Sequence, residues 1–134
     1  MVLERTRGER KERLDEGTLH VFPLDDYARD LREEIAYTAN GRNGVTLVKS
    51  PALRVVLEVL RAGAELAEHR APGPITVQVL EGEIRFHTGE DTFRVRAGEV
   101  LALPPGRPHS VEAVRDSALL ITLVPETQKV VTSH

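Results

Sequence analysis

The fold of this chain is decided by one stretch, Gly63-Ala-Glu-Leu-Ala-Glu-His69-Arg-Ala-Pro-Gly-Pro-Ile75-Thr-Val-Gln-Val-Leu-Glu-Gly82. It begins with a turn glycine, carries one histidine, passes through an irregular Pro-Gly-Pro loop and ends in an apolar strand. A second stretch, which begins 35 residues later, repeats this order: Gly98-Glu-Val-Leu-Ala-Leu-Pro104-Pro-Gly106-Arg-Pro-His109. The two units and the hairpin between them predict an all-β barrel whose mouth holds His69 and His109.

Around these units, apolar and polar residues alternate with a period of two, which is the pattern of half-buried strands. Val55 and Leu57 share one face of such a strand, whereas Arg54 and Glu58 lie on the other. We expect the apolar faces to line the interior of the barrel and to form a cup for a ligand. The ligand-binding residues predicted for this cup are Val55, Leu57, His69, Ile75, Val77, His109 and Val111.

The two units resemble the sequence motifs of the cupin family. The first cupin motif, Gly-x5-His-x-His-x3,4-Glu-x6-Gly, falls on Gly63, His69, Ala71, Ile75 and Gly82. The second, Gly-x5-Pro-x-Gly-x2-His-x3-Asn, falls on Gly98, Pro104, Gly106, His109 and Ala113. The resemblance covers roughly residues 53–124. It implies an all-β fold of the cupin type, a β-barrel also described as a double-stranded β-helix or jelly roll.

In cupins, the two histidines and the glutamate of the first motif hold a divalent metal together with the histidine of the second. Here Ala71 and Ile75 stand at two of these positions, and neither side chain can bind a metal. His69 and His109 remain, and imidazoles suit ions such as Zn, Fe, Ni and Cu; a metal bound here would be Zn, Fe, Ni or Mn. Because a stable site usually takes three or more protein ligands, we expect no cofactor. A divalent metal on this pair is the alternative.

Two classes of function stay open. The first is a small-molecule-binding cupin of unknown ligand, with an incomplete metal site and little or no catalysis. The alternative, implied by the resemblance, is a metal-dependent cupin enzyme of the dioxygenase, isomerase or decarboxylase class. It would use His69 and His109 as ligands or as acid and base. A cup filled by side chains would leave a third possibility, a structural or regulatory scaffold.

Composition argues against several other classes. A net charge of −3 on 134 residues gives no basis for binding nucleic acid or an anionic membrane. No apolar run approaches the roughly 20 residues of a membrane-spanning helix. The sequence has no cysteine, which excludes disulfides and thiolate chemistry. Its charged N-terminus lacks the apolar segment of a signal peptide, so we expect a cytoplasmic protein.

Four segments are expected along the chain. Residues 1–17 are mostly charged and should form a flexible N-terminus. Residues 18–44 should hold a short strand at 19–22 and a helix at 25–36, whose apolar stripe is Leu24, Tyr27, Leu31 and Ile35. The cupin barrel should occupy residues 45–125, followed by a tail at 126–134. We also expect a homodimer, because an open sheet edge is best protected by pairing with a second subunit.

Overall fold

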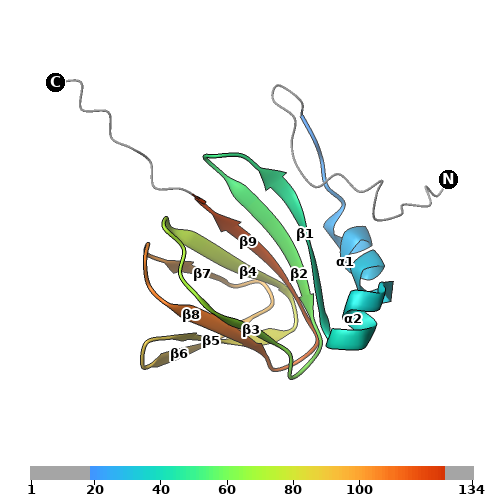
Figure 1. The fold of residues 1–134 in the computed structure, drawn as a ribbon. Helices are drawn as coiled ribbons and strands as arrows, with labels where there is room; N and C mark the ends of the chain where they lie inside the picture. The colour runs from blue at the N-terminus through green and yellow to red at the C-terminus, as the bar shows by residue number, and fades with distance from the viewer. Residues whose placement is uncertain (1–18, 126–134) are drawn as a thin grey trace.

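The computed structural model describes residues 19–125, which form two antiparallel β-sheets facing each other and two short helices at one side (Figure 1). The predicted segments 1–17 and 126–134 lie outside the described residues. The elements are α1 (Leu24–Glu33), α2 (Ile35–Asn40), β1 (Arg42–Lys49), β2 (Arg54–Leu60), β3 (Glu65–His69), β4 (Ile75–Glu81), β5 (Glu83–Thr88), β6 (Asp91–Arg96), β7 (Val100–Leu103), β8 (His109–Ala113) and β9 (Ser117–Leu123).

The larger sheet has the strand order β1-β2-β9-β4-β7, and the smaller sheet has the order β3-β8-β5-β6. The strands that pair are mostly distant in sequence, as in β2 with β9 and β5 with β8. The prediction of an all-β fold with a short N-terminal helix is confirmed.

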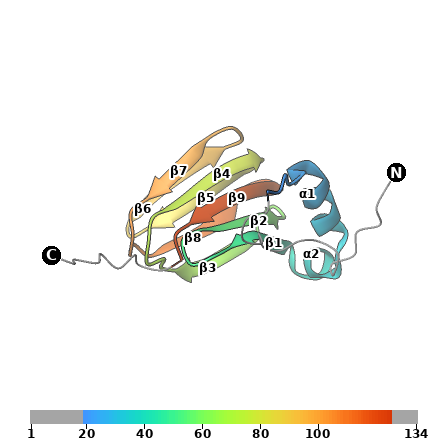
Figure 2. The same cartoon turned by 90° about the horizontal axis from the view of Figure 1, so that it is seen from above.

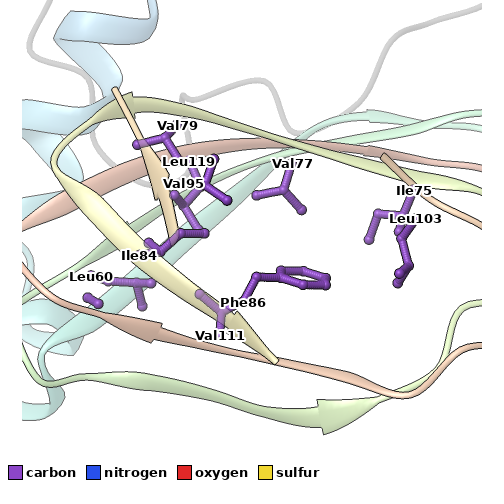
Figure 3. Close-up of a cluster of buried hydrophobic side chains, with 11 residues drawn as sticks. Leu60, Ile75, Val77, Val79, Ile84, Phe86, Val95, Leu103, Val111 and Leu119 are labelled. Carbon is purple, nitrogen blue, oxygen red and sulfur yellow. The ribbon is translucent and has the colours of Figure 1, made fainter. Parts of the chain in front are cut away.

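The interior between the sheets is made by alternate residues of the strands. On β4, Ile75, Val77 and Val79 are buried, whereas Thr76 and Gln78 are exposed. Figure 3 shows Phe86 pointing from β5 into the same interior, with Val77 above its ring. The buried cluster contains Leu60, Ile75, Val77, Val79, Ile84, Phe86, Val95, Leu103, Val111, Ala113 and Leu119.

A second apolar cluster lies on the outer face of the larger sheet. Figure 2 shows α1 and α2 beside β1 and β2, on the side away from β6 and β7. Tyr27, Ala28 and Leu31 of α1 are buried there against side chains such as Leu57 and Val59 of β2. As a result, β2 is covered on both of its faces. No helix in the described part of the chain is long and apolar enough to cross a membrane.

The N-terminal region differs from the prediction in two ways. Residues 19–22 form no strand within the described chain, so an edge strand there is not observed. The predicted single helix is interrupted at Glu34, whose ψ of 157° is extended. The break turns Ile35 outward, where it is 81% exposed, so the prediction that Ile35 continues the apolar stripe is wrong.

The turn between β4 and β5 depends on a glycine. Gly82 has a φ of +85°, which L side chains rarely adopt. A Cβ at this position would also collide with the carbonyl oxygen of Asp116 and with the side chain of Ser117. The buried Ser117 hydroxyl accepts a hydrogen bond of 3.1 Å from the backbone N–H of Glu83. The turn is therefore tied to the loop that leads into β9.

Candidate functional site

The structure brings His69 and His109 together. They are directly opposite each other in the antiparallel pair of β3 and β8. Their Nε2 atoms are 3.0 Å apart, and their ring centroids lie 4.1 Å apart with an angle of 65° between the planes. His109 is only 2% exposed, whereas His69 is open to solvent. The pair therefore joins the interior of the sandwich to its surface.

Backbone carbonyl groups orient both rings. The Nδ1 atom of His69 is 3.1 Å from the carbonyl oxygen of Ala67, and that of His109 is 3.2 Å from the carbonyl oxygen of Arg107. Each Nδ1 therefore carries a hydrogen that it donates to a carbonyl. In neutral rings this leaves a lone pair on each Nε2. Two lone pairs 3.0 Å apart repel, so the contact needs one shared proton or cation.

The environment of His109 favours its neutral form. Burial lowers the pKa of the His109 imidazole, the Arg107 carbonyl raises it, and a positive charge on His69 would lower it further. The ring also stacks on Phe86, with centroids 5.5 Å apart and planes within 10°. A neutral His109 that donates from Nδ1 can accept a hydrogen bond at its Nε2.

The histidine pair lies on the wall of a cup of about 420 Å³ between the two sheets. This volume is in the ordinary range for small-molecule sites. The cup is open at one end, and its walls are mostly apolar. It is lined by Thr46, Arg54, Val56, Glu58, Leu66, Ala67, His69, Ile75, Val77, Phe86, His109, Val111, Ile121 and Leu123.

Five of the seven predicted cup residues line this space: His69, Ile75, Val77, His109 and Val111. The prediction that Val55 and Leu57 line it is wrong, because both side chains face the cluster under the helices. Val56 takes the predicted place of these two residues, together with Arg54 and Glu58. Alternation had grouped the residues of β2 correctly but had assigned the two faces the wrong way round.

Glu58 is the cup residue that sequence reasoning missed most clearly, because a charged residue in an alternating strand is normally assigned to solvent. Burial raises the pKa of the Glu58 carboxyl to about 7, against the opposing charge of Arg42. Gly44 lies opposite Glu58 on β1, and a Cβ at position 44 would be 2.5–2.8 Å from the carboxyl group. The missing side chain of Gly44 thus leaves the space that this carboxyl occupies.

The residues present do not make a complete metal site. Among the described residues there is no group of three or more histidine, cysteine, aspartate or glutamate side chains that could hold an ion. Ile75 lines the cup with an apolar side chain, and Ala71 is buried in the loop after β3. The histidine pair offers two nitrogen ligands, fewer than a stable protein site usually has.

The other sequence candidates lie away from the cup or at its edge. Arg70 is exposed and donates a hydrogen bond of 3.3 Å to the carbonyl oxygen of Gly106. His87 lies on the outer face of the smaller sheet, where its Nδ1 is 2.9 Å from the Thr92 hydroxyl. A separate open hollow of about 590 Å³ lies along β6 and β7, and neither histidine of the pair lines it.

Comparisons with known proteins agree with this geometry. The family model described as "Cupin domain" matches residues 56–125, just over half of the chain. An RmlC-like cupin protein from Desulfovibrio desulfuricans is 30% identical, with a TM-score of 0.62, over 73% of this chain and 95% of its own. A conserved protein of unknown function from Streptococcus pyogenes is 26% identical, with a TM-score of 0.63, over 68% of this chain and 79% of its own.

A third solved structure is a mutant of salicylate 1,2-dioxygenase from Pseudoaminobacter salicylatoxidans, with a TM-score of 0.68 and 23% identity. The match covers 76% of this chain but 34% of that enzyme, so it shows a shared fold and no more. A comparison with curated proteins found no match. The family match and the sandwich with its two motif histidines lead to the same conclusion: the chain belongs to the cupin family.

Proposed function

We propose that this protein is a small-molecule-binding cupin whose ligand enters the cup and places a polar group on the His69–His109 pair. The observation that carries the proposal is the 3.0 Å contact between the two Nε2 atoms on the wall of an open cup. Each Nδ1 is held by a backbone carbonyl, so a ligand can engage the pair only at the Nε2 atoms, where its polar group would take the place of the contact between the two rings.

The walls indicate what else the ligand needs. Val77, Val111 and Ile121 present apolar surface, and polar groups are few. Concave sites of this kind bind small molecules with a largely apolar body, and a few polar groups fix the orientation. With two protein ligands in place of four, we infer little or no metal-dependent catalysis.

Nuclear magnetic resonance titration tests the proposal. 4-Hydroxybenzoate, 6-hydroxyhexanoate and their amides, which carry a polar group at each end, are added as probes, and the methyl signals of Val77 and Ile121 report on the cup. Val59, which lies under the helices, serves as the reference. At least one probe should shift the cup signals selectively, and His69→Ala should weaken its binding roughly tenfold.

His87→Ala is the matched control, because it removes an imidazole from the outer face of the smaller sheet. It should leave binding unchanged. If no probe shifts the cup signals, or if His69→Ala and His87→Ala behave alike, the proposal fails. Near-stoichiometric iron, manganese, nickel or zinc in protein purified without chelators would overturn the incomplete metal site.

A second candidate function is acid–base catalysis on a molecule bound in the cup. It is favoured by one observation, the presence of two proton-active groups, Glu58 and His109, in one enclosed space. Burial raises the pKa of Glu58 to about 7, so this carboxyl can give or take a proton near neutrality. Burial also lowers the pKa of His109, which keeps that imidazole neutral and able to accept a proton. If an activity is found, His109→Ala should abolish it without unfolding the protein, and full activity in that variant would exclude this candidate.

A further inference from the structure

The side chain of Arg54 brings a cation into the cup. Arg54 is the first residue of β2 and pairs with Leu123, the last residue of β9, so it lies where the larger sheet ends. Its side chain lines the cup and is half-buried. Its Nε atom is buried and has no hydrogen-bond partner in the described part of the chain.

Three other arginines each have a backbone carbonyl partner for a terminal nitrogen of the guanidinium group. Arg42 donates to the carbonyl oxygen of Glu65 over 3.0 Å, and Arg61 donates to that of Tyr37 over 3.0 Å. Arg70 donates to Gly106. A buried N–H of a charged group that makes no hydrogen bond costs free energy. A guanidinium presents its donors as a rigid fork that fits a carboxylate through two parallel hydrogen bonds. A carboxylate bound through this fork would give the buried Nε of Arg54 the acceptor it lacks.

The rest of the cup limits the charge of such a ligand. Between Arg54 and Glu58 the wall is apolar, since Val56 pairs with Ile121 of β9, and Ile121 pairs in turn with Val77 of β4. Glu58 lies four residues beyond Arg54, about 13 Å along the strand. It sits in register with Leu119, which pairs in turn with Val79, and both of these side chains are fully buried. A carboxyl group at that depth gives a second anionic group no favourable position.

We propose that the cup takes a small organic monoanion, whose carboxylate is held by Arg54 and whose apolar body lies against Val56, Val77 and Ile121. The inference rests on the proposed function and adds to it the class and the orientation of the ligand. Arg54 faces the interior from the larger sheet, and the histidine pair faces it from the smaller one. The ligand thus spans the two sheets, with its charged end on one and a neutral polar group on the other.

The test compares each carboxylate with the amide of the same shape: 4-hydroxybenzoate with 4-hydroxybenzamide, and 6-hydroxyhexanoate with 6-hydroxyhexanamide. Dissociation constants are measured by the methyl titration described above, at a pH of about 7.5, where the carboxylates are ionised. The wild-type protein should bind the carboxylates roughly ten- to hundredfold more tightly than the amides, since charge-assisted hydrogen bonds are the stronger ones. Arg54→Gln should remove this preference, and Arg54→Lys should retain part of it because the charge stays and the fork is lost.

Arg70→Gln is the matched control, because it removes an exposed cation next to His69 and leaves Arg54 in place. It should keep the carboxylate preference. Equal binding of carboxylates and amides by the wild-type protein, or a preference that survives Arg54→Gln, would overturn the inference and leave the proposed function standing. Failure of every probe to reach the cup would overturn both. Melting curves verify that each variant is folded. If Arg54→Gln does not fold, Arg54→Lys is used instead: a carboxylate preference as large as that of the wild type would overturn the inference.

Discussion

Replacing Glu58 by glutamine should stabilise the protein at pH 8 relative to the wild type, by an amount that disappears toward pH 4.5. Burial raises the pKa of the Glu58 carboxyl from its ordinary value of 4.5 to about 7, with Arg42 opposing the rise. A carboxyl whose pKa is higher in the folded state binds its proton more tightly there than in the unfolded chain. Its contribution to the free energy of unfolding is therefore complete below pH 4.5 and is lost as the pH rises through about 7.

The size of the effect follows from the same two values. A rise in the pKa of Glu58 from 4.5 to about 7 on folding corresponds to a loss of about 3 kcal/mol in the free energy of unfolding at pH 8. This is an upper figure, because the group is half-buried. The glutamine side chain has a similar shape and no charge, so it avoids this cost at every pH. The advantage of Glu58→Gln over the wild type should then grow by up to about 3 kcal/mol between pH 4.5 and pH 8.

Urea unfolding at pH 4.5, 6 and 8 measures the difference directly. Glu68→Gln, which removes an exposed carboxylate from β3, is the control and should show no such growth. Side-chain carboxyl resonances followed from pH 4 to 9 should give Glu58 a midpoint near 7. An advantage of Glu58→Gln that does not change with pH, or a midpoint near 4.5, would refute the burial argument.

Histidine titration acts in the opposite direction and must be separated from this effect. Burial lowers the pKa of His109 below its ordinary 6.5, so the stability that it contributes is lost as the pH falls below 6.5. The charged or titratable groups facing Glu58 are Arg54 in the cup, Arg42 on β1 and the two histidines on the smaller sheet. In Glu58→Gln, the loss of stability at acid pH should remain, because it comes from His109. The decrease in stability between pH 4.5 and pH 8 should be absent.

Three other features of the molecule can be tested by single substitutions or by mass. Ile75 lines the cup at the motif position where cupins carry glutamate, so Ile75→Glu should add a third metal ligand to the two histidines. Nickel or zinc should then raise the melting temperature of Ile75→Glu, but not that of the control Ile75→Gln. Gly82→Ala should lower the free energy of unfolding in urea by more than about 2 kcal/mol, because the new Cβ adds a steric clash to backbone strain. Gly89→Ala has open space around it and should lose about 1 kcal/mol, so equal losses would contradict this explanation. Light scattering should return the mass of two 14.9 kDa chains, and a monomer would refute the expected homodimer.

Local signals in the sequence predicted the β-strands, and the resemblance to cupins predicted that the two histidines meet. Turn glycines such as Gly63 and Gly98 adopt positive φ in the structure, at +89° and +88°, and they lie between strands. Motif spacing then placed His69 and His109 on strands that become neighbours. The strands depend on short windows of sequence, whereas the pairing of two residues 40 positions apart was predicted from the fold that the resemblance implies.

Which face of β2 would be the interior could not be predicted in this way. Alternation shows that Val55 and Leu57 share a face of the strand. Whether that face points into the sandwich or out of it depends on what covers it. Here α1 and α2 cover the face of Val55 and Leu57, so a fully apolar surface is buried outside the sandwich. The opposite face carries Arg54 and Glu58 into the cup, against the usual preference of charged residues for solvent.

The orientation of β2, opposite to the predicted one, also determines which charged groups line the cup. In the resemblance to metal-binding cupins, the polar groups gather at the motif positions, and here two of those positions hold Ala71 and Ile75. What remains of the motifs is a histidine pair on the smaller sheet, and the other charged groups come from a strand that carries no motif residue. An ion needs its ligands gathered around one point, whereas Arg54 and Glu58 are separated by about 13 Å of strand. Groups spread along an apolar wall suit an extended molecule with different ends, and this is why an organic anion fits the cup better than a metal alone.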